Sequence, residues 1–561
     1  MLYIGIAVAV LAVLFIKSIY DEKKYKEKLY RRMEKEWGQV PTQEYTEEKY
    51  NSLQFYYNQL EKDAGEIDSI TWNDLDMDQI FMTINNTGSA AGEEYLFAML
   101  HRLSFSKEEL AERNRLMEHF TKNKQARQAL QEQFMRMGKE KNISVYEYIH
   151  LLHLLKREGN TAHYASIAAM TAAFAGIFIQ PVAGVLAVIF VGVYNAFTYY
   201  KRKSEIEKYF TVVSHLIRMM DSMKALSMLT DKEISAYTKK IASTLKVFAG
   251  FRKGARIVAG KRPTGDLLEG LVDYVRMLFH IDLIKFNQMM KVFDNNEAEL
   301  TKLFETAGYL DAMIAAASFR VLMRDWCVPE LSLCEENPFL EVKEIYHPML
   351  DEPVKASLKE SRSVLITGSN ASGKSTFIKT LAINAILAQT INTAMAQEYH
   401  ASFFQVASSM ALRDDIFSKE SYYIVEIKSL KRIADRLNDK IPMLCFVDEV
   451  LRGTNTLERI AASAEILSDF ASRNAICFAA THDIELTHIL EEQYSNYHFQ
   501  EYVEDDKVLF DYKLYEGRAV SKNAIKLLKM LGYADRITKR AKERAERFEE
   551  TGEWGLIKQP V

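Results

Sequence analysis

Two stretches of the chain carry no charged side chains. Residues 2–16 are apolar, and residues 164–200 contain no Asp, Glu, Lys, Arg or His. The longer stretch exceeds the roughly 20 residues that one membrane span needs, and proline at Gln180-Pro181 interrupts it. The pattern therefore predicts a hairpin of two short transmembrane helices over residues 164–200. It also predicts an uncleaved N-terminal anchor over residues 1–20, because neither a basic leader nor a small-residue cleavage site marks a signal peptide.

Basic residues flank both apolar stretches. Because Lys and Arg gather on the cytoplasmic side of membrane helices, the C-terminal side of the anchor and both ends of the hairpin are expected in the cytoplasm. The abundant Ala and Gly of the hairpin suit close helix packing in lipid. Two alternatives remain open, an N-terminal helix docked on the protein and a hairpin buried in a soluble core. The flanking cations are Lys17, Lys23, Lys24, Lys26, Lys28, Lys156, Arg157, Lys201, Arg202 and Lys203.

Elsewhere before residue 330 the apolar positions recur at three- and four-residue spacing, which predicts helices over residues 72–137 and 205–324. The small residues of NNTGSAAG, at 85–92, predict a tight helix start packed against a neighbour. A basic, glycine-containing interruption follows at 251–265. Its cations fit the phosphates of nucleic acid or anionic lipid, or a solvated loop as the alternative. They are Arg252, Lys253, Arg256, Lys261 and Arg262.

A different pattern begins near residue 363, where the apolar run SVLIT is followed by GSNASGKST. This stretch fits G-x-x-x-x-G-K-[ST], a phosphate-binding loop between a strand and a helix. The glycines let successive N–H groups turn toward phosphate, and the helix presents its positive end to the same anion. Lys374 supplies a charge for the β- and γ-phosphates, and Ser375 a hydroxyl for Mg²⁺. The predicted nucleotide-binding residues are Gly368, Ser369, Asn370, Ala371, Ser372, Gly373, Lys374, Ser375 and Thr376.

Two further apolar runs have the character of buried parallel strands. MLCFVDE, at 443–449, ends in two acids, of which Asp448 is placed to hold Mg²⁺ and Glu449 to deprotonate the attacking water. The run AICFAATH, at 475–482, ends at His482, which is placed to contact the γ-phosphate. ATP and Mg²⁺ are the expected cofactors.

Composition adds three limits. The 561 residues are 48% hydrophobic and 26% charged, enough for more than one core. The net charge of −4 gives no overall basic field that would demand nucleic acid. The four cysteines form no C-x-x-C pair, so we interpret them as reduced thiols and expect neither zinc nor disulfides.

Several segments together resemble the MutS mismatch-repair ATPases. TGSNASGKST resembles the family's T-G-P-N-x-G-G-K-S-T, with Ser369 and Ser372 departing from it. DEVLRGTNTLE carries the R-G-T-x-T that follows the acidic pair in that family. ESYYIVEIKSL resembles the S-x-F-x-V-E-M element, FAATHDIEL the F-A-T-H-x-x-E-L segment, and DYKLYEGRAVSKNAI the closing Y-x-L-x-x-G stretch. The resemblance is strong over 340–541 and loose from about 65 onward.

The resemblance implies an α/β ABC-type P-loop ATPase domain with an all-α core and lever domain, assembled as a homodimer with two composite ATP sites. It assigns Ser421 to the partner's γ-phosphate. The expected divisions are the anchor at 1–20, a juxtamembrane helical segment at 21–64, the core and lever at 65–330 interrupted by the hairpin, the ATPase at 331–541 and a tail at 542–561. The mismatch-reading domain with its Phe-x-Glu element is not found, since the Phe-x-Glu at 339–341 lies at the entry to the ATPase.

The sequence thus predicts a MutS-like ATPase anchored in the inner, or cytoplasmic, membrane with its ATPase domain in the cytoplasm. Closure of its dimer would be coupled to handling of double-stranded or branched DNA, in mismatch repair or recombination, without direct reading of mismatches. The rival hypothesis is a mechanochemical ATPase that acts on membrane helices or a membrane partner without DNA. A transporter subunit is a weaker third option, because three spans leave little room for a pathway.

Overall fold

The computed structural model describes residues 2–139, 142–151, 159–248, 274–334, 337–369, 372–410, 422–452, 454–504, 507–519, 525, 528–529, 532–554 and 556–557. The chain forms two compact units. The helical unit comprises residues 1–61, 81–99 and 112–322, and the sheet unit comprises residues 62–80, 100–111 and 323–561. A helix-rich N-terminal region and mixed α/β sheets are therefore present, as the sequence predicted. The five-part division of the chain remains a prediction.

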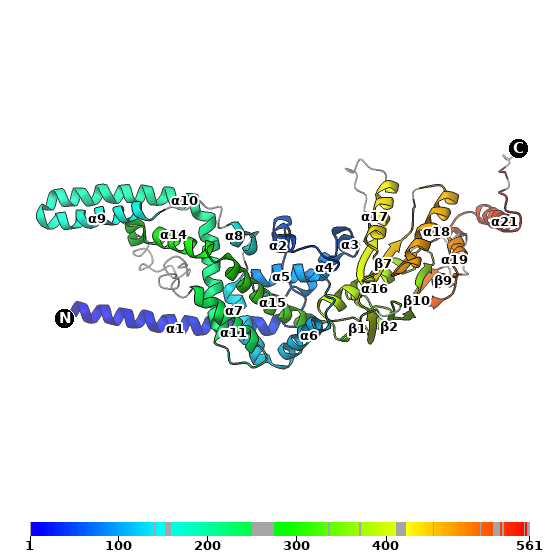
Figure 1. Ribbon diagram of the computed structural model, residues 1–561, viewed down its shortest axis with the longest axis horizontal. Helices are drawn as coiled ribbons and strands as arrows, with labels where there is room; N and C mark the ends of the chain where they lie inside the picture. Colours follow the sequence, from blue (N-terminus) through cyan, green and yellow to red (C-terminus); the bar gives the residue numbers. More distant parts are fainter. Residues whose placement is uncertain are drawn as a thin grey trace. The chain divides into compact units, whose positions relative to one another are not determined.

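The described elements of the helical unit are helices (Figure 1). Its elements are α1 (Leu2–Glu36), α2 (Glu47–Gln59), α5 (Ala90–Leu100), α7 (Lys124–Met137), α8 (Val145–Leu151), α9 (Thr161–Ile179), α10 (Pro181–Ser227), α11 (Ser235–Leu245), the 3₁₀ turn η2 (Lys246–Phe248), α14 (Ile281–Asp294) and α15 (Glu297–Leu322). Helices α4 (Met77–Ile84) and α6 (Lys107–Lys122) each extend across a boundary between the two units.

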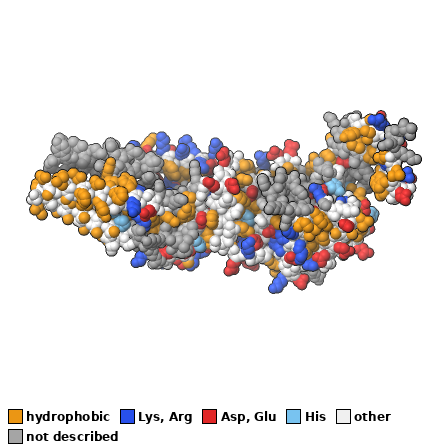
Figure 2. Space-filling model, turned by 90° about the horizontal axis from the view of Figure 1, so that it is seen from above, with side chains coloured by type: hydrophobic (Ala, Val, Ile, Leu, Met, Phe, Trp, Pro, Cys, Tyr) orange, Lys and Arg blue, Asp and Glu red, His pale blue; other side chains and the backbone are white. Residues whose placement is uncertain are grey.

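The break predicted at Gln180-Pro181 is present, since α9 ends at Ile179 and α10 begins at Pro181. The two helices lie side by side as a hairpin (Figure 1). Among the described residues, Thr161–Ile179 and Pro181–Ile206 are long and apolar enough to cross a membrane, and few of their side chains are buried. Figure 2 shows apolar side chains over the tip of this hairpin. Along the whole hairpin, the most exposed apolar side chains are Phe178, Ile179, Val182, Leu186, Phe190, Val193 and Phe197.

Helix α10 continues well past the predicted end of the hairpin at residue 200. It is 47 residues long and runs without a break through Lys201, Arg202 and Lys203. Lys and Arg are good helix formers, so the basic flank changes the polarity of the helix without ending it. Beyond this flank, Val213, Leu216 and Met220 are buried, in the part of α10 that contacts α7 and α11.

The tight helix start predicted at 85–92 is confirmed. A side chain at Gly92 would place its Cβ 2.2 Å from Oδ2 of Asp311 on α15, so α5 and α15 approach too closely there for a larger residue. The carboxylate of Asp311 accepts hydrogen bonds from the N–H groups of Gly88 and Ser89, at 3.0 and 2.8 Å, and from the Ser89 hydroxyl at 2.6 Å. Burial raises the pKa of Asp311 to about 6, although these donors oppose the shift.

The described residues of the sheet unit form two sheets. Strands β1 (Glu330–Ser332), β2 (Leu340–Ile345), β3 (Ala356–Glu360) and β5 (Glu398–Ser402) form one in the order β1-β5-β2-β3. Strands β4 (Ser363–Thr367), β6 (Gln405–Ser409), β7 (Met443–Asp448), β8 (Ala475–Ala480), β9 (Tyr494–Glu504) and β10 (Lys507–Glu516) form the other, in the order β10-β9-β4-β8-β7-β6. Only the β9–β10 pair of the larger sheet is antiparallel. The three strands predicted from apolar runs are β4, β7 and β8, which lie side by side.

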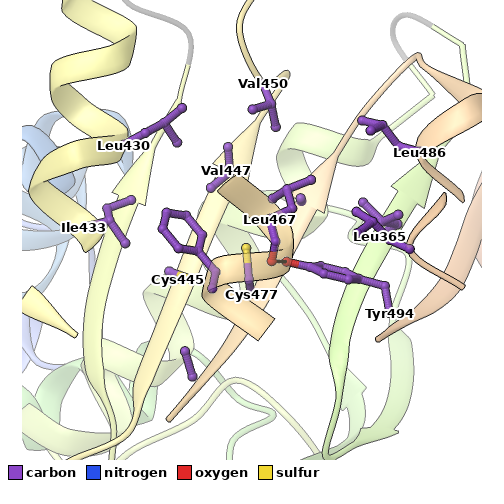
Figure 3. Packing of buried hydrophobic residues seen from close by; sticks show 14 of the residues in the cluster. Leu365, Leu430, Ile433, Cys445, Val447, Val450, Leu467, Cys477, Leu486 and Tyr494 are labelled. Carbon is purple, nitrogen blue, oxygen red and sulfur yellow. Dashed lines mark hydrogen bonds between the residues drawn. The ribbon is translucent and has the colours of Figure 1, made fainter. Parts of the chain in front are cut away.

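Helices α3 (Ser69–Asp74), α16 (Lys374–Thr390), α17 (Tyr422–Arg436), α18 (Thr456–Ser472), α19 (Ile484–Ile489) and α21 (Asp535–Thr551) complete the sheet unit. Leu430 and Ile433 of α17 and Leu467 of α18 pack with β7 and β8 in one buried cluster (Figure 3). Cys445 and Cys477 are partners in the β7–β8 register and both are free. All four cysteines are free thiols, as the sequence predicted.

Ion pairs attach the early segment 62–80 to the rest of the sheet unit. Asp68 pairs with Arg432 and, at 2.6 Å, with Arg436, both on α17. Asp76 pairs with Lys379 of α16 at 2.6 Å. These contacts join residues more than 300 positions apart in the sequence.

Candidate functional site

The candidate site lies where the parallel strands β4, β7 and β8 reach their carboxyl ends, which is where open α/β sheets bind ligands. Strand β4 ends at Thr367, and α16 begins at Lys374. Between them Gly368 and Gly373 have φ of 150° and 109°, in the region that favours glycine. A side chain at Gly368 would place its Cβ 2.9 Å from Ser372 Oγ and 3.0 Å from the Phe499 carbonyl oxygen, so the loop requires glycine there.

Lys374 is the charged residue of the loop motif, and it lies among the described residues. Its ammonium donates hydrogen bonds to the carbonyl oxygens of Gly368 and Ser369, both at 2.9 Å. Burial lowers the pKa of Lys374 to about 8, while the nearby Asp448 favours the charged form. Ser375 and Thr376 are exposed in the first turn of α16, where the first N–H groups of a helix have no partner within the helix.

Asp448 is the last residue of β7 and lies opposite Ala480 of β8. Its Oδ1 atom is buried, and no hydrogen-bond donor among the described residues reaches it. A buried carboxylate oxygen without a donor suits a hard divalent cation, which prefers oxygen ligands. The arrangement therefore fits the predicted Mg²⁺ site, with Asp448 and the Ser375 hydroxyl as the protein ligands.

Glu449 follows directly, and its carboxylate lies between the imidazole of His482 and the guanidinium of Arg452. The Nε2 atom of His482 is 3.2 Å from Oε1 of Glu449, and the Arg452 guanidinium pairs with Oε2. Burial lowers the pKa of His482, and the positive charges of Lys374 and Arg452 lower it further. The imidazole is therefore held toward its neutral form near pH 7, in which one ring nitrogen can accept a hydrogen bond and the other can donate one.

Two contacting residues were not among the predicted site residues. Glu426 of α17 accepts hydrogen bonds from the N–H groups of Leu451 and Arg452, at 2.5 and 3.1 Å. Glu501 of β9 accepts a hydrogen bond from the hydroxyl of Ser369, the loop position that departs from the MutS pattern. The departure at Ser369 was the available signal for Glu501. Glu426 appeared only as a letter of a family motif, without a partner to give it a role.

Several predicted residues cannot be placed. Asn370 and Ala371 of the loop, Ser421, and the basic residues Arg252–Arg262 lie outside the described residues. The roles assigned to them remain predictions. Among the predicted residues that are described, the structure brings together Gly368, Gly373, Lys374, Asp448, Glu449 and His482 at one end of the larger sheet. Ser369, Ser372, Ser375 and Thr376 lie in the same loop and the first turn of α16.

The fold and the site define a mixed α/β domain with a glycine loop, a loop lysine and two acids at the carboxyl end of a mainly parallel sheet. Residues 364–549 match the family model described as MutS domain V. The chain is similar to MutS protein homolog 4 of Mus musculus, with 32% identity over 268 residues, covering 44% of this chain and 27% of that protein. It is also similar to the DNA mismatch repair protein MutS of Thermotoga petrophila, with 31% identity over 272 residues, covering 47% and 33%.

These matches support a MutS-like family for this chain and confirm the resemblance found in the motifs. The chain spans about a third of the length of the curated relatives it matches. The activity, substrates and partners of the whole relatives are therefore matters for proposal.

Proposed function

We propose that this chain is a membrane-anchored ATPase of the MutS type, in which ATP binding closes a homodimer and hydrolysis reopens it, coupled to the handling of DNA. The observation that carries the proposal is the convergence of the glycine loop, Lys374, Asp448, Glu449 and His482 at one sheet end. Relatives bearing the name DNA mismatch repair protein MutS support the class of activity.

Each group at the site has a defined task in this proposal. The N–H groups of the loop and the start of α16 bind the phosphates, and Lys374 neutralises the β- and γ-phosphate oxygens. Ser375 and Asp448 would hold Mg²⁺, which would supply positive charge to offset the charge that develops on the phosphate oxygens. Glu449 accepts a proton from the attacking water, and the N–H of His482 turns from Glu449 to donate a hydrogen bond to the γ-phosphate.

The present contacts also define what ATP must change. Lys374 donates hydrogen bonds to carbonyl oxygens of its own loop, and the Glu449 carboxylate forms an ion pair with Arg452. Phosphate would compete for Lys374, and release of Arg452 would free one carboxylate oxygen of Glu449 for water. ATP binding would therefore rearrange both the loop and the turn after β7. In the proposed dimer, Ser421 of the partner would complete each site.

Membrane attachment rests on the α9–α10 hairpin. Its exposed side chains are mainly apolar along both helices. An exposed apolar surface of this kind marks a site of contact with lipid or with another protein. Tyr164, Tyr194 and Tyr200 are exposed toward the base of the hairpin, next to the basic run at 201–203. Aromatic residues and cations in that order are typical of the cytoplasmic boundary of a membrane. The hairpin would thus hold the protein at the inner membrane with the ATPase in the cytoplasm.

The DNA part of the proposal is tested by ATPase activity of the purified protein in detergent, with homoduplex, mismatched and branched DNA. We expect stimulation or binding that depends strongly on salt and is nearly equal for homoduplex and mismatched duplex, since phosphate contacts carry no base information. Branched or bent DNA should be preferred. A mismatch preference above about tenfold, or ~1.4 kcal/mol, would show that a direct reader exists.

A second function is favoured by the continuity of α10. One helix carries the exposed apolar residues of the hairpin at one end and buried residues of the helical unit at the other. Such a helix suits a mechanochemical ATPase that acts on membrane helices or a membrane partner. Absence of binding to every DNA at low salt, together with ATPase activity that changes on reconstitution into liposomes, would favour this function over DNA handling.

A further inference from the structure

The turn that follows β7 has an unusual backbone. Glu449 and Leu451 have φ of 55° and 59°, in the left-handed region that side chains with a Cβ rarely adopt. Two such residues within three positions form a turn that the local sequence does not favour. Contacts from outside the turn must therefore maintain it, and because Glu449 lies in this turn, those contacts also determine where its carboxylate points.

Three sets of contacts hold the turn. Val450 and Leu451 are 4% and 1% exposed and belong to the buried cluster, where Figure 3 labels Val450. The hydroxyl of Ser463 donates a hydrogen bond to the Val450 carbonyl oxygen at 3.3 Å. The carboxylate of Glu426 accepts hydrogen bonds from the N–H groups of Leu451 and Arg452, one on each of its two oxygens. Successive N–H groups that turn toward one anion form a nest, and here the anion is a side chain.

We propose that Glu426 is a positioning residue for ATP hydrolysis, because its carboxylate holds the turn that presents the carboxylate of Glu449. This inference rests on the proposed ATPase function. The backbone of Glu449 is fixed on one side by its N–H bond to the Ala480 carbonyl oxygen at 2.9 Å. On the other side, Glu426 fixes the N–H groups of Leu451 and Arg452, two and three residues after Glu449. Glu426 therefore sets the direction of the turn between Glu449 and Arg452.

The position of Glu426 separates its effect from nucleotide binding. Lys374 and Ser375 lie on the β4–α16 segment, whereas Glu426 lies on α17 and bonds to the segment after β7. Loss of its carboxylate would free two N–H groups and let the turn relax, with Arg452 still able to pair with Glu449. A shift of the general base by about 1 Å lowers a rate by up to about a hundredfold. The affinity for ATP would stay the same.

The test compares Glu426→Ala and Glu426→Gln with the wild type in full-length protein in detergent. Turnover and equilibrium binding of ATP are measured for each. We expect kcat to fall about ten- to a hundredfold in Glu426→Ala, with ATP affinity within about twofold of wild type. Glu426→Gln keeps one acceptor oxygen and the side-chain volume, so its kcat should lie between those of wild type and Glu426→Ala. This variant carries the test if the alanine variant does not fold. Asp435→Asn is the matched control, because Asp435 lies on the same helix and pairs only with the exposed Lys431 among the described residues.

A second measurement asks whether Glu426 acts through Glu449. In the Glu449→Gln background, Glu426→Ala should change the residual turnover by less than about twofold, since residues that act as a unit are not additive. The inference is overturned if the full loss persists in that background, if ATP affinity falls in parallel with kcat, or if both single variants turn over like wild type. Wild-type protein that does not hydrolyse ATP overturns the proposed function and this inference with it, and so is distinguishable from a failure of Glu426 alone.

Discussion

The imidazole of His482 and the carboxylate of Glu449 lie 3.2 Å apart, Nε2 to Oε1, although they come from different strand ends. Their strands β7 and β8 are neighbours in register, so the two side chains meet above the same edge of the sheet. With the imidazole favoured in its neutral form, the pair does not need to be an ion pair near pH 7. A hydrogen bond between them leaves the carboxylate charged and able to accept a proton from water.

Replacing Glu449 by Gln should therefore leave ATP binding intact and slow turnover by at least about a hundredfold, the usual scale of a lost general base. Single-turnover hydrolysis and equilibrium ATP binding measure the two effects. Glu465→Gln, an exposed acid on α18, should behave like wild type in both assays. Turnover near the wild-type rate in Glu449→Gln would remove Glu449 from its proposed role.

A second prediction concerns pH. Without phosphate, burial holds the pKa of Lys374 at about 8, and bound phosphate should raise it because an opposite charge favours the ammonium. The bound state then holds more protons than the free state as pH rises above about 8. ATP affinity should be constant below pH 8 and should fall above it, approaching tenfold per pH unit. Binding isotherms between pH 7 and 9.5, with calorimetry in two buffers to detect proton uptake, measure this.

Lys374→Arg is the informative variant, because arginine does not titrate in this range. The ATP affinity of this variant should not change with pH. Lys379→Ala, on the same helix but paired with Asp76, should keep the wild-type dependence. A wild-type affinity that does not change between pH 7 and 9.5 would contradict the prediction.

The third prediction is that the two subunits of the proposed dimer share each ATP site. Ser421→Ala and Lys374→Ala proteins should each be inactive alone. When they are mixed, one site of the mixed dimer keeps both an intact Lys374 and an intact Ser421 from the other subunit, so partial ATPase activity should return. Crosslinking of differently tagged subunits verifies that mixed dimers form. If they form and the mixture stays as inactive as its parents, Ser421 does not act across the interface.

The fourth prediction is that the hairpin holds the chain in the membrane. Carbonate-washed membranes should retain the full-length protein, and removal of residues 1–20 alone should not release it. Phe190→Lys places a charge near the middle of the apolar part of α10. It should weaken retention, because a lysine at the centre of a membrane helix raises the free energy of insertion by about 2.5–3.5 kcal/mol. Val247→Lys, at an exposed apolar position outside the hairpin, is the control. A full-length protein that is monodisperse without detergent would contradict membrane insertion.

The parts of this molecule that could be predicted from sequence are those in which a local pattern has one physical solution. SVLIT followed by a glycine-bounded loop and a lysine predicts a buried strand and the start of a helix, and these are β4 and α16. Proline at 181 has no N–H to donate, so the uncharged stretch had to break there. Runs of apolar residues ending in acid or histidine located the ends of β7 and β8.

Other parts depend on contacts that no local pattern contains. Asp68 and Asp76 belong to the sheet unit because of arginines and a lysine more than 300 residues later, and their own surroundings in sequence are merely polar. The smaller sheet joins short strands from residues 330 to 402 in the order β1-β5-β2-β3, which does not follow their order in the sequence. Glu426 is an ordinary acid on a helix until the turn after β7 brings two N–H groups to it.

If the hairpin inserts in a membrane as proposed, the length of α9 and the unbroken course of α10 have a consequence for the choice of membrane. With 19 residues, α9 spans about 28 Å, slightly less than the ~30 Å hydrocarbon layer of an average bilayer. In a thicker bilayer the hairpin would be short, and the mismatch would be met by local thinning or by a change in helix tilt. Because α10 contains no joint between Pro181 and Ser227, a change in its tilt in the lipid would reach the buried residues at its far end. Lipid chain length would then act on the helical unit as a mechanical input.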